Sequence, residues 1–317
     1  METVIAFALT GVYWLRPDIF SALTILPAWT WLFLVVPVLP FLRRRHLRYS
    51  IIFLSAWVLF LVLHVEEPRS LARGLMGPVS KQKPPGTLRL VTINCAGGQK
   101  AVLHEIKKLE PDIVFLQESP RKSDIALFVH ELFGTEGAYL YGFDTSILVR
   151  GKLSKVKQGD HRRFFIHATI NFPGRGPIDL VSLRLATGNI RTDLWNPACW
   201  NDHLQHRRRQ INQVQRIVME LPESHLIVVA GDFNAPQGDR VFSFLPATLY
   251  DTFAMAGKGI GNTILNDMPV LRIDQIWVSR DFVTLQSFSR QTTWSDHRMV
   301  VSDIKEKGSA REQDNGG

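Results

Sequence analysis

An uncharged apolar run, Leu226–Ala230, leads directly into the polar tetrapeptide Gly231-Asp232-Phe233-Asn234. A short apolar run bounded by turn residues predicts a strand that is covered on both faces, and so a layered fold. Alternate residues of an extended segment point to the same side, so Asp232 and Asn234 are expected to project together from the strand end. A carboxylate beside an amide suits phosphoryl chemistry, in which one group orients or deprotonates water and the other donates to a phosphate oxygen. A structural turn is the alternative, because Asp and Asn are common turn residues.

Polar residues adjoin apolar runs at three other places, and one more acid lies within an alternating segment. These are Leu88–Ile93 before Asn94, Asp112–Leu116 before Gln117 and Glu118, Ser295-Asp296-His297 before Met299–Val301, and Arg272–Val278 with Asp274. Together they supply oxygen ligands for a hard cation and an acid/base pair.

In this order the segments resemble the endonuclease/exonuclease/phosphatase superfamily over roughly residues 87–303. That superfamily includes pancreatic deoxyribonuclease, abasic-site endonucleases, neutral sphingomyelinases and inositol polyphosphate 5-phosphatases. The resemblance implies an α/β fold, a four-layer α/β sandwich in which two mixed β-sheets pack face to face with helices outside. It also implies an active site at one end of the sandwich and a hydrolase that depends on Mg²⁺, with Mn²⁺ as the substitute.

The resemblance also implies residue roles. Glu118 would hold the divalent cation, with Asn94 beside it and Asp296 close to the metal. Such a sparse oxygen site suits Mg²⁺, which keeps several of its waters.

The other matching residues would carry out the chemistry. Asp232 would be the general base, and Asn234 would donate to the phosphate. His297, protonated, would bind the phosphate and stabilise the transition state. Asp274 would orient His297 and raise its pKa, because a nearby carboxylate favours the charged imidazole.

Two positions depart from the family pattern or blur it. Arg184 stands where many members carry a His. An Arg can clamp a phosphate but does not lose its proton, so the general acid stays open between a metal-bound water, His203 and His206. Arg162 or Arg163 matches a phosphate-contacting Arg; strand alternation puts one of them on the site side, and we carry Arg163 as the candidate.

Charge and cysteine content limit the partners. The chain has 317 residues, a formal net charge of +8 and a sequence pI near 9.7, which suggests anionic partners such as nucleic acid or phospholipid headgroups. A basic surface without a specific partner is the alternative, and the run His206–Arg209 has the same two interpretations.

Cys95 and Cys199 are too few for a disulfide scaffold; a buried free thiol is expected at Cys95, with a bridge left open.

Residues 1–65 are expected to anchor the chain in a membrane through two or three transmembrane helices. Ile19–Leu42 has no charged residue and is long enough to span, Tyr49–Leu63 is a shorter run, and Thr3–Leu15 is the third candidate. The basic loop Arg43–Arg48 favours the cytoplasmic side. The catalytic part would then lie outside the cytoplasmic (inner) membrane, although Arg69, Arg73, Lys81 and Lys83 weaken that assignment.

The rest of the chain divides into a polar linker at 66–86, a catalytic domain at 87–304 and a disordered tail at 305–317. Expected strands are 88–94, 112–117, 145–150, 164–171, 178–185, 226–230, 273–279 and 298–304, and expected helices are about 100–109 and 204–221.

The function expected from the sequence is a membrane-anchored, metal-dependent phosphodiesterase of the nuclease kind. A phospholipid or inositol-phosphate phosphodiesterase is the first alternative, and a catalytically weak membrane scaffold or binding module is the second. The expected partners are a phosphodiester substrate, either nucleic acid or a phospholipid headgroup, and the lipid bilayer; no protein partner is inferred.

Overall fold

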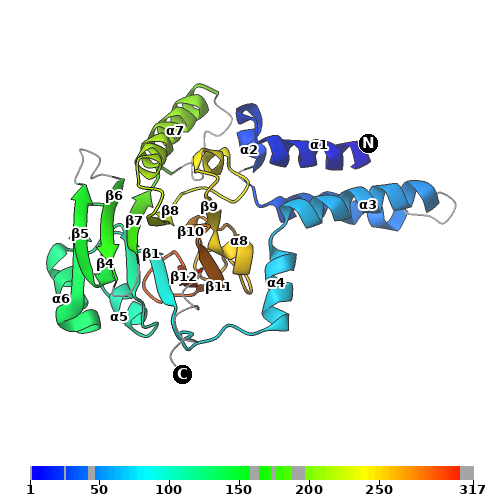
Figure 1. Ribbon diagram of the computed structural model, residues 1–317. Coiled ribbons are helices and arrows are strands. Elements are labelled where there is room, and N and C mark those ends of the chain that lie inside the picture. The colour runs from blue at the N-terminus through cyan, green and yellow to red at the C-terminus, as the bar shows by residue number, and fades with distance from the viewer. Residues whose placement is uncertain are drawn as a thin grey trace.

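The computed structural model describes residues 2–24, 26–41, 47–157, 164–172, 176–187 and 197–307. Within them two six-stranded mixed sheets pack face to face, and helices cover the outer faces (Figure 1). The expected four-layer α/β sandwich is therefore confirmed. The first sheet has the order β11-β12-β1-β2-β4-β3, and the second has the order β5-β6-β7-β8-β10-β9.

The first sheet is built around the parallel pair β1 and β2, and all its other strand pairs are antiparallel. Its strands are β1 (Leu88–Asn94), β2 (Ile113–Gln117), β3 (Gly137–Tyr141), β4 (Thr145–Arg150), β11 (Phe282–Arg290) and β12 (Met299–Glu306). Leu88 and Leu90 belong to the core between the sheets, whereas Val91 and Ile93 belong to the core under α5 (Val102–Lys107) and α6 (Lys122–Phe133). Burial on both faces explains why β1 is apolar almost throughout.

The second sheet repeats this plan around the parallel pair β7 and β8. Its strands are β5 (Lys152–Lys157), β6 (Phe165–Asn171), β7 (Pro177–Arg184), β8 (Leu226–Asp232), β9 (Leu249–Asp251) and β10 (Asp274–Ser279). Val228 and Ala230 of β8 face the inner core, and Ile227 and Val229 face the core under α7 (Pro197–Met219). The short helices η6 (Arg240–Phe244) and α8 (Thr252–Ala256) follow β8 and β9, and η5 (Gly134–Glu136) follows α6.

The carboxyl ends of the two central parallel pairs meet at one edge of the sandwich. Asn94 pairs with Gln117 at the end of β1 and β2, and Arg184 pairs with Asp232 at the end of β7 and β8. The antiparallel strand β10 begins at the same edge, where Asp274 pairs with Asp232. We call this the catalytic edge, after the role expected for it from the sequence; the strand register places the polar strand ends there.

The N-terminal segments project from the sandwich as an elongated apolar bundle (Figure 1). They are α1 (Glu2–Leu15), η1 (Asp18–Phe20), α2 (Ser21–Thr24), η2 (Ala28–Leu34), η3 (Val36–Phe41) and α3 (Leu47–His64). The expectation of one continuous helix over Ile19–Leu42 is wrong, because this stretch forms short helices separated near Pro27 and Val35. Pro27, Pro37 and Pro40 lack the backbone N–H that a continuous α-helix needs. Among the described residues, one helix, α3 with its 18 residues, is long and apolar enough to cross a membrane.

The expected linker at 66–86 contains a helix, α4 (Glu67–Met76). Pro68 near its start has no N–H to satisfy, so it fits the first turn of a helix. Arg73 donates from Nε to the backbone oxygen of Gly257 at 2.8 Å, which fixes α4 against α8. At the other end of the chain β12 continues to Glu306, and residues 308–317 of the expected tail lie outside the described residues.

Candidate active site

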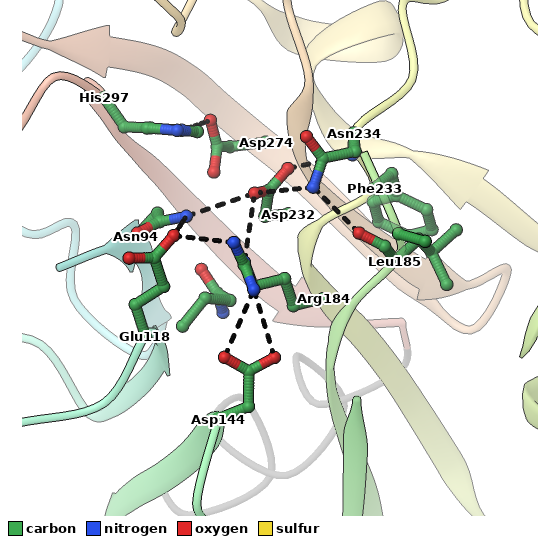
Figure 2. A network of polar contacts seen from close by, with 12 residues as sticks. Asn94, Glu118, Asp144, Arg184, Leu185, Asp232, Phe233, Asn234, Asp274 and His297 are labelled. Atoms are coloured by element: carbon green, nitrogen blue, oxygen red, sulfur yellow. Dashed lines mark hydrogen bonds and ion pairs between the residues drawn. The ribbon is translucent and has the colours of Figure 1, made fainter. Parts of the chain in front are cut away.

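Asp232 lies at the centre of the catalytic edge and is almost fully buried (Figure 2). Its Oδ1 accepts from the backbone N–H of Asn234 at 2.8 Å, and its Oδ2 accepts from Nδ2 of Asn94 at 3.2 Å. Nδ2 of Asn234 donates to the same Oδ2 at 3.1 Å. These donors come from β1 and from the turn after β8, so both sheets together fix the orientation of this carboxylate.

Asn234 holds Asp232 in place in addition to lying beside it. Its Nδ2 also donates to the backbone oxygen of Leu185, at 2.8 Å, so the amide ties β8 to β7. Its φ of 47° lies in the left-handed region, which Asn tolerates better than most residues. The expected donation from Asn234 to a phosphate would have to compete with these two hydrogen bonds.

Asp274 and His297 form a buried pair on the other side of Asp232 (Figure 2). Nδ1 of His297 lies 2.8 Å from Oδ2 of Asp274. The N–H groups of Ile273 and Asp274 both donate to Oγ1 of Thr263, which holds the start of β10. Because Nδ1 is taken by Asp274, Nε2 is the ring nitrogen left to face a substrate.

Burial and mutual charge shift the pKa values of this cluster. Burial, with the charge of Asp274 added to it, raises the pKa of Asp232 to about 7. Burial alone would lower the pKa of His297, but the charge of Asp274 and its hydrogen bond outweigh burial and raise the pKa to about 9. Near neutral pH the site therefore combines a carboxyl group poised to exchange a proton with a charged imidazolium.

Glu118 follows β2 and faces Asn94 across the catalytic edge. Its Oε1 accepts from Nδ2 of Asn94 at 3.2 Å, and its Oε2 accepts from the backbone N–H of Gly97 at 2.5 Å. Glu118 has a φ of 47°, and Ala96 nearby has a φ of 44°. Left-handed backbone at non-glycine residues is costly and is typical of functional sites, which supports a role for this turn.

Arg184, at the end of β7, lies among three carboxylates (Figure 2). Nη2 donates to Oε1 of Glu118 at 2.8 Å, Nη1 lies 3.4 and 3.5 Å from the two carboxylate oxygens of Asp144, and Nε lies 3.9 Å from Oδ2 of Asp232. Sequence reasoning missed Asp144. It stands before β4 in an ordinary turn, and only the proximity of Arg184 distinguishes it.

Asp296 precedes His297 in the chain, and its charge is one of those that raise the pKa of His297. The side chain of Asp296 is exposed and lines a groove of about 720 Å³ that also includes Asn266 and Thr292. Within the described residues, no hydrogen bond or ion pair joins the Asp296 side chain to Glu118 or Asn94. Arg162 and Arg163 lie outside the described residues.

Two arginines of the basic run His206–Arg209 on α7 form ion pairs within the chain. Arg207 is buried and its Nη1 pairs with Asp239 at 2.7 Å. Arg208 pairs with Asp18 of the N-terminal segment, and Arg240 lies 3.3 Å from the same carboxylate. Two of the three arginines are thus used within the chain, which weakens the interpretation of this run as a nucleic-acid surface.

Cys95 and the two histidines considered as general acids are not among the contacts of Asp232, Glu118 and Arg184 described above. Cys95 is buried and free, so the buried thiol expected from the sequence is confirmed. Burial raises its pKa well above the ordinary range. His203 and His206 lie on α7, and the contacts described for the catalytic edge include neither of them.

Two groups of side chains have ligand atoms suited to a cation. Glu118 supplies carboxylate oxygens of the kind that Mg²⁺ prefers. Asn94 lies beside it with Nδ2 facing Oε1 of Glu118, while Oδ1 of Asn94 accepts from the backbone N–H of Ala96. The ligand atoms of Asp232, Asp274 and His297 lie within 4.8 Å of one another. In that second group, however, His297 would first have to lose the proton that Asp274 stabilises, so Glu118 and Asn94 are the better match.

Known proteins share both the sequence pattern and the fold of this chain. The sequence pattern of the Endonuclease/Exonuclease/phosphatase family matches residues 91–297. The chain belongs to this family. The match begins in β1 and ends at His297, so it covers every strand end that contributes to the catalytic edge. A search of curated proteins finds no match.

Solved structures share the fold of this family member at low sequence identity. TDP2 from D. rerio, complexed with a single-strand DNA product, has a TM-score of 0.53 and 18% identity over 69% of this chain and 99% of the other. The mannosyl-6-phosphatase Bt3783 from Bacteroides thetaiotaomicron has a TM-score of 0.55 and 15% identity over 68% and 99%. An endonuclease/exonuclease/phosphatase from Bacteroides vulgatus has a TM-score of 0.55 and 14% identity over 70% and 99%.

Proposed function

We propose that this chain is a membrane-anchored, metal-dependent phosphodiesterase of the nuclease kind. The observation that carries the proposal is the position of Asp232. Asn94 and Asn234 hold this buried carboxyl group, and it lies between the Arg184 guanidinium and the Asp274–His297 pair. One base, one imidazolium and one guanidinium around a single point match the needs of phosphoryl transfer.

The proposed roles follow from these contacts. Asp232 takes a proton from the attacking water, which its raised pKa permits near neutral pH. His297 donates from Nε2 to a phosphoryl oxygen and offsets the negative charge that grows in the transition state. Arg184 contacts the phosphate from the opposite side and keeps its own proton throughout.

Glu118 and Asn94 are the residues we propose for Mg²⁺, with Mn²⁺ as the substitute. Carboxylate and amide oxygens suit a hard cation, and the turn that carries Glu118 is fixed by the N–H of Gly97. To act as a ligand, Oδ1 of Asn94 would exchange its hydrogen bond with the N–H of Ala96 for the ion. When bound, the ion would polarise a phosphoryl oxygen and offset charge on the leaving oxygen. Asp296, exposed on the neighbouring groove, would act at longer range.

A nucleic acid is the leading substrate, and one observation also favours a phospholipid headgroup. The complex of D. rerio TDP2 with a single-strand DNA product supports the first choice by analogy of fold. The second rests on the N-terminal bundle, which contacts a loop of the catalytic edge. Arg16 donates from Nη1 to the backbone oxygen of Asp239 at 3.3 Å, five residues after Asn234.

The apolar bundle supports an anchor in the cytoplasmic membrane. α1 and α3 pack side by side around Tyr13 and Phe60, while Ile51, Val58 and other large apolar side chains remain exposed. Exposed apolar patches of this kind mark membrane or protein contacts. At about 1.5 Å per residue α3 is about 27 Å long, close to the roughly 30 Å of a bilayer core. We place the catalytic domain on the extracytoplasmic side, and a reporter fused after Gly317 that works only in the cytoplasm would overturn this.

The test uses the full-length chain in detergent micelles. Single-stranded and double-stranded DNA, sphingomyelin vesicles, and an aryl phosphodiester with its matching monoester are offered with Mg²⁺ and with chelator. Asp232→Asn serves as the inactive control. We expect cleavage that chelator abolishes and that falls roughly 10²-fold or more in the variant. Absence of both cleavage and metal binding would favour the alternative of a weak scaffold or binding module, whereas metal binding without cleavage would point to another substrate or to a missing general acid at Arg184.

A further inference from the structure

Glu66 joins the apolar bundle to the catalytic domain. It lies between α3 and α4, is 9% exposed, and accepts from Nε of Arg272 at 2.9 Å and from Nη2 at 3.2 Å. Arg272 is buried as well, and its Nη2 also lies 2.6 Å from Oδ2 of Asp251. A carboxylate at the base of the bundle is thus one of two counter-ions for a guanidinium inside the domain.

Arg272 is two residues before Asp274, and the backbone between them is part of the catalytic edge. The N–H of Asp274 donates to Oγ1 of Thr263 at 3.2 Å, and the oxygen of Ile273 accepts from the N–H of Phe233 at 2.9 Å. Phe233 stands between Asp232 and Asn234 in the chain. The few residues after Arg272 therefore set the position of the proposed base and of the Asp274–His297 pair at once.

Glu66 contacts the other catalytic segment directly. Nε2 of Gln237, three residues after Asn234, donates to Oε1 of Glu66 at 3.4 Å. The next residue, Gly238, lies so close to Tyr13 of α1 that a Cβ there would be 3.0 Å from the ring. A pocket of about 90 Å³ at this seam is lined by Tyr13, Glu66, Gln237 and Arg272 among others. The bundle thus touches both loops that lead to or from the active site.

Removal of the Glu66 carboxylate would leave Arg272 poorly paired. Nη1 of Arg272 has no hydrogen-bond partner among the described residues, and Nε has Glu66 alone. A buried charged donor without a partner is costly, so the side chain would shift to find water or another acceptor. Because Arg272 is only two residues from Asp274, such a shift would move the start of β10.

We propose that Glu66 is a positioning residue of the active site. By holding Arg272 it holds Asp274 and His297, so the segment at the base of the apolar bundle is a structural part of the catalytic apparatus. The kinetic part of this inference rests on the proposed phosphodiesterase function, whereas the structural part stands by itself.

The experiment compares full-length wild type, Glu66→Ala and Glu66→Gln in micelles, with Glu67→Gln as the matched control on the adjacent residue. Hydrogen–deuterium exchange of peptides covering 271–276 reports the start of β10. We expect exchange there to be about 10-fold faster in Glu66→Ala, intermediate in Glu66→Gln, which keeps one oxygen acceptor, and unchanged in Glu67→Gln. We also expect kcat to fall about 10-fold in Glu66→Ala with little change in KM.

Two outcomes would overturn the proposal. One is wild-type exchange at 271–276 in both Glu66 variants. The other is faster exchange spread evenly over both sheets, which would mean a general loss of stability without a specific effect on β10. If the wild type cleaves no phosphodiester, the proposed function fails, but the exchange data still decide the role of Glu66.

Discussion

Arg184 donates from Nη2 to Oε1 of Glu118 at 2.8 Å, so a fixed cation already contacts the carboxylate proposed to hold the metal. Many relatives are expected to carry a His at this position, which can be neutral when a metal binds. The guanidinium cannot, because it keeps its charge at any ordinary pH. Asp144, 3.4 Å from Nη1, offers the guanidinium a second carboxylate.

The first prediction concerns competition between Arg184 and the metal for Glu118. Two cations beside one carboxylate repel each other, and at a few ångströms the repulsion amounts to about 1–4 kcal/mol, depending on exposure to water. We expect Arg184→Gln to bind Mn²⁺ about 10-fold more tightly than wild type, measured by titration calorimetry. We also expect its kcat to fall, because the phosphate loses a contact.

Asp144→Asn provides the control for this prediction. In the wild type it should weaken Mn²⁺ binding, because the guanidinium then relies on Glu118 more completely. In the Arg184→Gln background the same change should have a much smaller effect. Equal effects in both backgrounds would mean that Asp144 acts only through its charge, and an unchanged Mn²⁺ affinity in Arg184→Gln would rule out the competition.

The second prediction concerns the stability cost of Asp232. Its folded-state pKa of about 7 lies above the ordinary value of 3.8, so the folded state binds more protons than the unfolded state between these values. The free energy of unfolding therefore falls as pH rises from about 4 to about 7. Asp232→Asn removes this dependence, so its stability relative to wild type should rise over that interval by on the order of 3 kcal/mol. Denaturant unfolding at pH 5 and pH 8, with chelator present, measures the difference, and a pH-independent difference would contradict the assignment.

Sequence patterns predicted most of the catalytic edge because most of its residues end or begin an apolar run. Asp232, Asn234 and Asn94 are visible in this way. Contacts between segments distant in sequence were not visible: Asp144 sits in an ordinary turn, and Glu66 was assigned to a linker. A start signal was present there, since Glu67-Pro68 is typical of the first turn of a helix.

In the N-terminal region the sequence predicted a helix that the structure does not contain. The absence of charged residues over Ile19–Leu42 predicted one long helix. That prediction failed because hydropathy does not report whether the backbone can form helical hydrogen bonds. Pro27, Pro37 and Pro40 each remove a donor, and the structure forms short helices there. The basic run on α7 was likewise ambiguous, because only the folded chain brings Asp18 to Arg208 and Asp239 to Arg207.

The third prediction is a bell-shaped pH dependence of kcat/KM. Deprotonation of Asp232 should produce the acid limb near pH 7, and deprotonation of His297 should produce the alkaline limb near pH 9. Asp274→Asn removes the charge that raises the pKa of His297, so the alkaline limb should move to lower pH. Rates from pH 5 to 10 at saturating Mg²⁺ test this, and an alkaline limb that stays in place would separate His297 from that ionisation.

The fourth prediction concerns Gly231 of β8, which pairs with Leu183 of β7. Its φ of 147° is a conformation that residues with a side chain rarely adopt, and a Cβ there would lie 1.9 Å from the backbone oxygen of Leu183. Any side chain would therefore force β7 and β8 apart at the residue before Asp232. We expect Gly231→Ala to lower the free energy of unfolding by more than about 2 kcal/mol and to abolish activity.

Gly176→Ala is the control, because nothing lies within 4 Å of a Cβ there. Gly176→Ala should change stability by less than about 0.5 kcal/mol. If thermal unfolding shows the two variants to be equally stable, the close approach of β7 and β8 does not constrain Gly231.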